Sequence, residues 1–450
     1  MRIAFVNQPI DTILPPYQSS IGACTYGVAC SLAQHESCEV IVYGSTAANR
    51  MHHAKEINQN EVRFLFLPTT IGDRLLRLAR DQYSKVFRPA SPASTSSLHY
   101  PAFGRMVAMD LQQRKCDVIH VQHCSQYVPV IRAFNPTAKI ILHLHAEWFS
   151  QNRTSPLEHR LRECDMVTGV SDYVVNCIRR DFPSISDRSA TTYNGIDVAE
   201  FARERKYTSA ADEKPRRIMY AGAVSPHKGL HVLLDAFKLV VRAYPNVVLD
   251  IIGFQGTYGL EETFDMNDRA ALATVSEFYN KQYLTRIKAR LALAPADSGT
   301  YLSYLKAQCS PEIAGRVSFL GLIPRSALLD AYFNSDVFAF PPVWNEGFGI
   351  PPVEAMAAGT PVVASRSGAC VETVLHQETG FLVEKNDSAA LAKALIALLQ
   401  DDALRERMGR SARRRALEHF SWQNISDSVY QRYLGLHRAP RIPRSVLQHS

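Results

Sequence analysis

Short apolar segments alternate with amphipathic segments along this chain, in two successive series. The strand candidates of the first series lie at 3–6, 39–43, 62–67, 118–121, 140–145, 166–170 and 190–193. Those of the second lie at 218–221, 247–252, 317–320, 337–340, 361–364 and 380–383. Strands that alternate with helices build βαβ units, whose parallel sheets are covered by helices on both faces. The sequence therefore predicts two doubly wound α/β domains.

The length of the chain agrees with two domains, because 450 residues exceed the roughly 250–300 residues at which a single core stops growing. Between the two series, apolar periodicity disappears and charged residues accumulate. A polar stretch at 256–293 is expected to be an inserted helical excursion, and 89–97 a mobile low-complexity loop. We expect five segments: an N-terminal Rossmann-like domain at 1–200, a linker at 201–215, a second Rossmann-like domain at 216–421, a last helix at 422–436 that crosses back to the first domain, and a flexible tail at 437–450.

Composition favours a cytoplasmic protein. The nine cysteines are scattered without a Cys-x-x-Cys pair, which is typical of reduced thiols. The N-terminus lacks the features of a signal peptide, and no segment approaches the ~18 apolar residues of a membrane span. Membrane contact is therefore expected to be peripheral, at the inner face. Residues 73–88 form a basic amphipathic segment, which is interpreted as a surface helix that packs its leucine face on the domain, with an anionic membrane as the alternative.

The strongest motif is the segment 345–354, NEGFGIPPVE, which follows one strand candidate and precedes another. Gly347 and Gly349 allow the backbone to approach a bound ligand closely. Two prolines then begin a helix, whose first-turn N–H groups point back at that ligand. Glu346 precedes this helix and Glu354 lies within it, so the two carboxylates can reach opposite ends of one elongated molecule. A sugar nucleotide is such a molecule.

This segment resembles the motif of retaining glycosyltransferases of family 4, in which seven residues separate two glutamates. The resemblance implies the GT-B fold, in which two Rossmann-like domains face each other across a cleft and bind the acceptor and the nucleotide-sugar donor, respectively. It places Glu346 at the donor sugar and its phosphate, and Glu354 at the ribose hydroxyls. It also implies that the N–H groups of Phe348, Gly349 and Ile350 hold sugar hydroxyls and phosphate oxygens.

A second motif, YAGAVSPHKG at 220–229, ends a strand in a glycine turn before a predicted helix. A diphosphate gains negative charge as it leaves a sugar, so a fixed cation and a helix N-terminus beside it lower the barrier. The resemblance identifies Lys228 as the family's diphosphate lysine. The family usually has an arginine where this chain has Ala223. We expect either weaker donor binding or a substitute such as His227, Arg325 or another basic residue.

The first half offers fewer candidates. In the loop at 15–22, only Gly22 remains of the glycines that the family places beside the donor phosphates. His145 ends a strand and resembles the family histidine that approaches the donor sugar from the acceptor side. A strand places His143 on the same face, but His143, His120 and His123 are expected to be structural. No carboxylate or cysteine cluster completes a metal site with them.

The sequence thus predicts a hexosyltransferase-like enzyme of polysaccharide or glycoconjugate biosynthesis, with Glu346 and His145 as catalytic residues. Retention of configuration follows from the resemblance alone. No Asp-x-Asp pair occurs, which argues against a metal-bound donor, and no further cofactor is expected. The acceptor is a sugar, a lipid-linked molecule or a small molecule, and no nucleic acid is expected. A sugar-nucleotide epimerase or phosphorylase of the same fold and an inactive binding or scaffolding relative remain alternatives. A dehydrogenase is disfavoured, since neither half has a Gly-x-Gly-x-x-Gly turn after its first strand.

Overall fold

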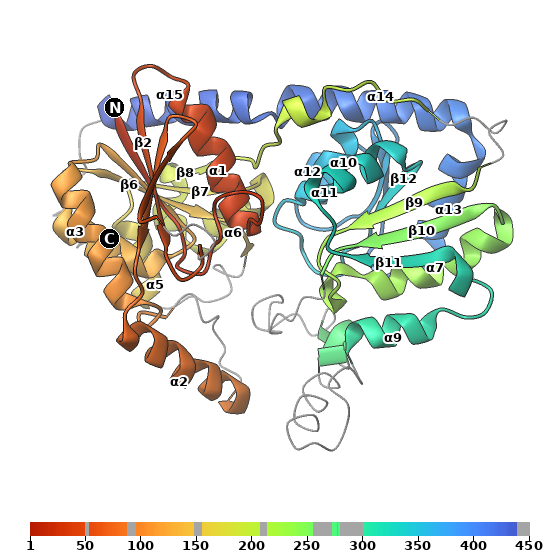
Figure 1. Ribbon diagram of the computed structural model, residues 1–450, viewed down its shortest axis with the longest axis horizontal. Coiled ribbons are helices and arrows are strands. Elements are labelled where there is room, and N and C mark those ends of the chain that lie inside the picture. The colour runs from red at the N-terminus through yellow and green to blue at the C-terminus, as the bar shows by residue number, and fades with distance from the viewer. Residues whose placement is uncertain are drawn as a thin grey trace. The chain divides into compact units, whose positions relative to one another are not determined.

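The structure is a computed structural model that describes residues 1–49, 54–87, 96–147, 155–207, 214–254, 272–276, 278–279 and 300–438. The chain folds into two compact units (Figure 1). Unit 1 comprises Met1–Gly195 and Ser421–Ser450, and unit 2 comprises Ile196–Phe420. Most of the predicted loop at 89–97, of the predicted insertion at 256–293 and of the predicted tail lies outside the described residues.

Unit 1 is built on an eight-stranded sheet of order β3-β4-β2-β1-β5-β6-β7-β8. Its strands are β1 (Arg2–Val6), β2 (Glu39–Ser45), β3 (Glu56–Gln59), β4 (Val62–Leu67), β5 (Val118–Gln122), β6 (Lys139–Leu144), β7 (Met166–Gly169) and β8 (Ser189–Thr191). Only β3 pairs antiparallel, with β4. The helices of unit 1 are α1 (Ser20–Ala33), α2 (Ile71–Phe87), α3 (Pro101–Arg114), α4 (Val128–Phe134), α5 (Ser155–Arg162), α6 (Asp172–Asp181) and α15 (Trp422–Arg438).

The last helix of the chain, α15, packs on the first helix of unit 1. The ring of Trp422 lies against two glycines: a Cβ added to Gly27 would lie 2.2 Å from this ring, and one added to Gly195 would lie 2.6 Å from it. Further along α15, the hydroxyl of Ser426 lies 2.7 Å from that of Ser31. Any side chain at either glycine would therefore displace the indole, so packing explains the glycines at positions 27 and 195.

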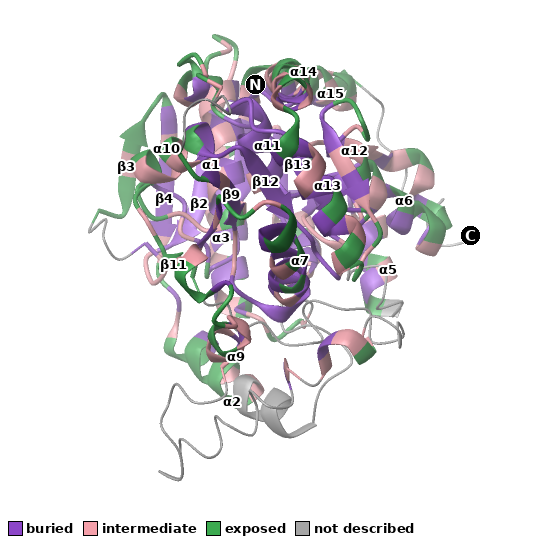
Figure 2. Ribbon diagram, turned by 90° about the vertical axis from the view of Figure 1, so that its right-hand side faces the viewer, coloured by how far each residue is buried: buried purple, intermediate pink, exposed green. Residues whose placement is uncertain are grey.

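Unit 2 is built on a parallel six-stranded sheet of order β11-β10-β9-β12-β13-β14. Its strands are β9 (Arg216–Ala221), β10 (Val247–Ile252), β11 (Val317–Gly321), β12 (Val337–Phe340), β13 (Val362–Ser365) and β14 (Gly380–Val383). Its described helices include α7 (Leu230–Ala243), α9 (Tyr301–Gln308), α10 (Arg325–Asn334), α11 (Ile350–Ala357), α12 (Cys370–Thr373), α13 (Ser388–Gln400) and α14 (Asp402–His419). Figure 2 shows β9, β12 and β13 coloured as buried, and β12 and β13 are buried at every residue.

The predicted linker at 201–215 differs from what the structure shows. Its described residues before position 208 pack on unit 2, which begins at Ile196 rather than at residue 216. The guanidinium of Arg205 donates hydrogen bonds to Thr360 Oγ1 at 2.6 Å and to the carbonyl of Tyr332 at 3.2 Å. The hydroxyl of Tyr207 donates to the carbonyl of Gly359 at 3.3 Å. The segment was predicted to be a linker, whereas Arg205 and Tyr207 donate to carbonyls at the ends of helices of unit 2.

Candidate active site

In each sheet, the order of the strands reverses beside the first strand: β1 lies between β2 and β5, and β9 lies between β10 and β12. Ligands of doubly wound folds bind beyond the carboxyl ends of the strands at such a point. In unit 2, the loops after β9 and β12 carry Lys228 and Glu346. The Nζ atom of Lys228 lies 2.6 Å from Oε2 of Glu346, and both side chains are largely buried. The structure thus brings the two strongest predicted residues into direct contact.

Lys228 lies in a short helix, η7 (Pro226–Lys228), that directly precedes α7. Gly229 adopts φ +71° between them, and a Cβ there would lie 1.9 Å from the carbonyl oxygen of Pro341. Glycine therefore allows the turn after β9 to touch the end of β12. The ammonium of Lys228 lies 4.7 Å from the centroid of the Trp344 ring, and this indole N–H donates to Glu346 Oε2 at 3.1 Å. Trp344 thus holds both members of the ion pair.

The backbone of Glu346 is fixed from the neighbouring loop. Its N–H donates to Ser367 Oγ at 3.2 Å, and its carbonyl accepts from the N–H of Ala369 at 2.8 Å. A Cβ at Gly368, which adopts φ +48°, would lie 2.2 Å from that carbonyl oxygen. On the other side, Gly349 adopts φ +85° and caps α11. Gly368 and Gly349, both with positive φ, therefore allow the two loops to pack closely around the backbone of Glu346.

Glu354 lies in α11 with its carboxylate buried and both oxygens occupied. Oε1 lies 2.6 Å from Nη1 of Arg325, and Oε2 accepts from the hydroxyl of Tyr332 at 2.9 Å. Burial raises the pKa of Glu354, which the charge and hydrogen bond of Arg325 oppose. Arg325 also pairs with Glu200. Its pKa is raised, because its bonds to Glu200 and Glu354 outweigh the burial that lowers it.

The remaining predicted donor residues surround the start of α11. Ile350 is the first residue of that helix, and Gly347 and Gly349 are buried in the loop before it. The side chain of Phe348 is 3% exposed and packs edge-on against Phe420 at 5.6 Å between ring centroids. The aromatic side chain therefore serves packing, which leaves the backbone of this loop for contact with a ligand.

Ala223 occupies the position where the family usually has an arginine, and the structure separates the possible substitutes. His227 is buried near Ser225 and Tyr279, and burial together with Lys228 holds its pKa well below the ordinary value, so it is neutral. Arg325 is engaged by the two glutamates. Lys385 follows β14, and its Nζ donates to Oδ1 of Asn345, next to Glu346, at 2.8 Å. Of these three side chains, Lys385 alone combines a positive charge with a place beside the Glu346 loop.

In unit 1, His145 follows β6 at the carboxyl end of the sheet. Its Nε2 lies 2.8 Å from Oε1 of Gln122, the last residue of β5, so with this oxygen as acceptor the ring carries its proton on Nε2. Its backbone N–H points at Nδ1 of His123 at 3.2 Å, and its ring lies edge-on to that of His143 at 4.7 Å. Burial, together with the neighbouring histidines, holds the pKa of His145 well below its ordinary value.

The other three histidines are anchored inside unit 1. His120 Nδ1 lies 2.5 Å from the hydroxyl of Tyr433 in α15, and His143 Nδ1 lies 2.8 Å from Thr168 Oγ1. Burial lowers the pKa of His120 and of His123 to about 3 each, and it holds the pKa of His143 well below the ordinary value. These rings are therefore neutral.

Gly22 lies in the first turn of α1, where its N–H donates to Ser19 Oγ at 3.0 Å. A Cβ at Gly22 would lie 2.0 Å from the carbonyl oxygen of Thr12. Ser19 in turn donates to Oδ1 of Asp11 at 2.9 Å, and burial raises the pKa of this carboxyl to about 6. Glycine thus lets the loop after β1 fold tightly onto the helix start.

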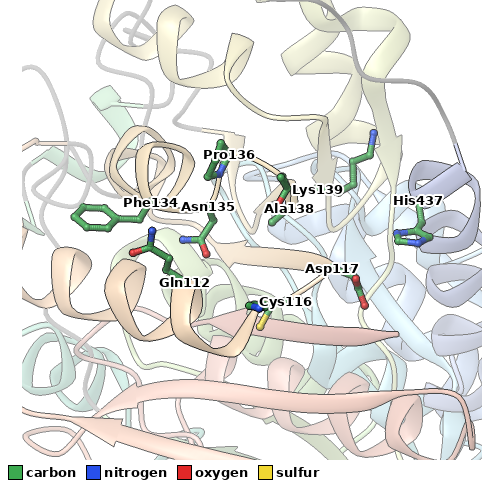
Figure 3. A pocket seen from close by; sticks show the side chains of 11 residues that line it. Gln112, Cys116, Asp117, Phe134, Asn135, Pro136, Ala138, Lys139 and His437 are labelled. Atoms are coloured by element: carbon green, nitrogen blue, oxygen red, sulfur yellow. The ribbon is translucent and has the colours of Figure 1, made fainter.

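A separate hollow of about 600 Å³ lies in unit 1, between α3, α4 and the beginnings of β5 and β6 (Figure 3). Its lining includes Asp117, Asn135 and Lys139. This is the amino end of the strands, opposite the edge that carries Gln122 and His145. It contains none of the residues that the sequence singles out.

Several partners of the predicted residues were missed in the sequence, namely Trp344, Tyr332, Ser367 and Glu200. No motif marks Tyr332, Ser367 and Glu200, because their partners lie on other loops and helices. Trp344 directly precedes the segment 345–354, and its partner Glu346 lies two residues further along the same loop. In the part of the chain that the structure describes, there is no group of three or more His, Cys, Asp or Glu side chains able to hold a metal ion. Among the described helices, none is long and apolar enough to cross a membrane.

Solved structures share this fold. Sucrose-phosphate synthase from Thermosynechococcus elongatus superposes with a TM-score of 0.66 at 20% identity, over 98% of this chain and 100% of that one. HepE from Anabaena, solved in complex with UDP and glucose, gives a TM-score of 0.62 at 18% identity, over 97% and 100% of the two chains. These likenesses confirm the predicted GT-B class of two α/β domains.

Sequence comparison identifies the family. Residues 202–415 match the family model of glycosyl transferases group 1, and residues 29–200 match that of glycosyltransferase family 4. The putative glycosyltransferase YtcC of Bacillus subtilis is 26% identical over 355 residues, which are 75% of this chain and 78% of YtcC. The phosphatidyl-myo-inositol mannosyltransferase of Mycobacterium leprae is 42% identical over 208 residues, 46% of this chain and 43% of that enzyme. The chain therefore belongs to the family 4, group 1 glycosyltransferases, which are enzymes of the GT-B fold.

Proposed function

We propose that this glycosyltransferase moves a sugar from a nucleotide diphosphate donor to an acceptor hydroxyl with retention of configuration and without a metal ion. The contact between Lys228 Nζ and Glu346 Oε2 carries the proposal. It places a cation for the departing diphosphate next to a carboxylate for the sugar, beside the start of a helix. HepE, whose title names UDP and glucose as bound molecules, supports a nucleotide sugar as the donor.

In the proposed reaction, the bond between the sugar C1 and the diphosphate oxygen breaks as the acceptor oxygen bonds to C1 on the same face. The acceptor proton passes to a phosphate oxygen of the leaving diphosphate. Lys228 stabilises the negative charge that develops there, and Lys385 supplies a second cation in place of the missing arginine. Glu346 and His145 steady the sugar, and the N–H groups of residues 348–350 hold its hydroxyls and the phosphate.

Glu354 is proposed to accept hydrogen bonds from the ribose hydroxyls. An ionised carboxylate has about four lone-pair sites, and Arg325 and Tyr332 occupy one site on each oxygen. One site on each oxygen therefore remains for the two hydroxyls. Arg325 favours the ionised form of this buried carboxylate, which makes it a positioning residue for nucleotide binding.

The proposed partners are a nucleotide-sugar donor, an acceptor that is a sugar, a lipid-linked molecule or a small molecule, and a membrane met peripherally at its inner, cytoplasmic face. No cofactor is proposed. The named mannosyltransferase relative acts on phosphatidyl-myo-inositol, which supports a lipid-linked acceptor.

The test is release of nucleotide diphosphate from a panel of sugar nucleotides, with and without acceptor alcohols, by the wild-type chain and by Glu346→Gln. We expect acceptor-dependent release that the substitution abolishes. Glu384→Gln is the matched control in the same unit, because its side chain is 75% exposed. Proton NMR of the product tests retention, and an assay in chelator tests metal independence. Turnover without an acceptor would replace the proposal with an epimerase, and release unaffected by Glu346→Gln would remove this residue from the mechanism.

A further inference from the structure

Helix α2 of unit 1 turns its polar side toward the rest of the unit. Asp73 is 1% exposed, and its carboxylate accepts from the N–H groups of Ala102 at 3.0 Å and of Phe103 at 3.2 Å, at the start of α3. One turn further, Nη1 of Arg77 donates to the hydroxyl of Tyr100 at 3.0 Å. Residues four apart share one face of a helix. Hydrogen bonds on this face therefore fix the orientation of α2.

The opposite side of α2 is apolar and faces outward. Ile71, Leu75 and Leu78 are 75%, 60% and 57% exposed. Their spacing of four and three residues forms one stripe, which begins two residues, about 200° of helical rotation, away from Asp73. A surface helix ordinarily turns such a stripe toward the core. Leu76, three residues after Asp73, is half-buried, whereas the interpretation that the leucine face packs on the domain is wrong for Leu75 and Leu78.

A basic residue flanks the stripe. Arg74 is exposed and lies one turn from Leu78, beside the stripe. Figure 1 shows that α2 extends away from the sheet of unit 1, which leaves the stripe at the periphery of that unit. The apolar side chains together with a flanking guanidinium match the acyl boundary and the phosphates of a lipid surface.

We propose that the α2 face, defined by Ile71, Arg74, Leu75 and Leu78, docks on a membrane surface that contains anionic phospholipid. The apolar side chains enter the boundary between headgroups and acyl chains, and the guanidinium meets lipid phosphates. A second copy of the chain is a poorer occupant, because three side chains on one helical stripe fall far short of the roughly 800 Å² per partner that a stable interface buries. The α2 face would be the surface that makes the peripheral membrane contact included in the proposed function. This docking does not depend on the proposed transfer reaction.

The test is flotation of the full chain with vesicles of phosphatidylcholine alone and with vesicles that also contain phosphatidylglycerol. We expect binding to the anionic vesicles that weakens as salt is added, because ions screen the attraction. The double substitution Leu75→Gln and Leu78→Gln keeps helix-forming residues and is expected to weaken binding about tenfold or more, since burial of apolar area drives interfacial binding. Arg74→Gln is expected to weaken binding to the anionic vesicles only.

The matched control replaces Leu320 and Leu322 by Gln, two leucines of unit 2 that are 48% and 73% exposed. This variant is expected to bind vesicles like the wild type. Equal binding to both kinds of vesicle, or binding unaffected by the α2 substitutions, would overturn the proposal. A concentration-dependent dimer in analytical ultracentrifugation that the α2 substitutions abolish would assign the surface to a second copy instead. Because the readout is binding, it is independent of whether the proposed transfer is correct.

Discussion

The side chains at the carboxyl ends of the two sheets differ in charge. In unit 2, the side chains keep their charges in pairs, Lys228 with Glu346 and Arg325 with Glu354. In unit 1, His145 and its three histidine neighbours lie close together and are neutral, because burial lowers the pKa of each ring. The carboxyl end of the unit 2 sheet therefore carries ion pairs, and that of the unit 1 sheet carries neutral imidazole rings.

The difference indicates what each edge is suited to bind. Largely buried ion pairs contribute little net stability, because desolvation offsets their attraction. The Lys228–Glu346 pair fits the proposed donor: in the proposal, the diphosphate competes with Glu346 for the ammonium and releases the carboxylate toward the sugar. Neutral imidazoles suit uncharged sugar hydroxyls. Substitutions at the two edges should therefore differ in magnitude and in pH dependence.

The largest effect is expected for Glu346→Gln, which keeps the size of the side chain and removes its charge. We expect kcat to fall by about 10²–10³, the usual loss for one group that stabilises a transition state. The substitution also leaves Lys228 without a charged partner, so thermal unfolding must be compared with the wild type. The double variant Lys228→Gln with Glu346→Gln removes that imbalance. Restored activity in the double variant would contradict the roles assigned to both residues.

A tenfold effect is expected for Arg325→Gln. Burial raises the pKa of Glu354 and Arg325 opposes this, so the substitution raises it further. Donor binding needs the ionised carboxylate and is therefore lost as pH falls through the higher pKa. We expect KM for the donor to rise about tenfold at neutral pH, as when one charge-assisted hydrogen bond is removed, and to rise more steeply toward acid. KM measured across pH tests this.

Two variants control the Arg325 experiment. Arg325→Lys keeps the charge and is expected to recover part of the affinity. Arg242→Gln removes an arginine from an exposed pair with Glu312 in the same unit and should change nothing. An unchanged KM and pH profile for Arg325→Gln would mean that Glu354 does not depend on this arginine.

Much of the fold can be read from the sequence because buried parallel strands are continuous apolar runs. The strands β4, β10, β12 and β14 begin and end at the predicted residues. The strand β3 was missed, because its residues EINQ are polar and mostly exposed, and it pairs only at the edge with β4. The start of α1 at Ser20 has no apolar signal in the sequence, because its cap at Ser19 lies in a loop without apolar periodicity.

The candidate site is less readable. The spacing of the segment 345–354 indicates Glu346 and Glu354, and the family resemblance adds Lys228. Spacing does not indicate Glu200, which lies 125 residues before its partner Arg325 and is brought there by the fold. Nor does it indicate which side of α2 faces the domain, because periodicity defines a stripe but not its direction. The hydrogen bonds of Asp73 to the start of α3 decide which side of α2 faces the domain.

A smaller effect is expected for His123→Asn in unit 1. It should change the pH dependence of the unfolding equilibrium constant by about fivefold for each pH unit. The pKa of His123 is about 3 in the folded chain and about 6.5 when unfolded. As pH falls below 6.5 only the unfolded chain takes up the proton, so stability is lost down to about pH 3. His123→Asn removes this loss and suits the left-handed backbone at φ 66°. We expect a shallower pH dependence, by about 1 kcal/mol per pH unit.

Hydrogen exchange of the β5 and β6 amides in urea, between pH 6.5 and 4.5, measures this stability in unit 1 alone. His159→Asn, at an exposed histidine of α5 in the same unit, is the control and should leave the slope unchanged. Identical slopes for the wild type and His123→Asn would show that the ring takes up its proton in the folded state, and the contrast between the two edges would then disappear.

The smallest effect, about threefold in KM for the donor, is expected for Lys385→Met. Its ammonium is held by the amide oxygen of Asn345 and not by a carboxylate, so it remains available to a phosphate at a partly exposed position where one charge contributes modestly. The loss should appear with the diphosphate donor and with free nucleotide diphosphate, but not with the nucleoside, and should shrink as salt is added. Lys393→Met, in α13 of the same unit, is the control. An equal loss of affinity for the nucleoside would show that Lys385 organises the loop at Asn345, and a different side chain would then have to supply the charge that Ala223 lacks.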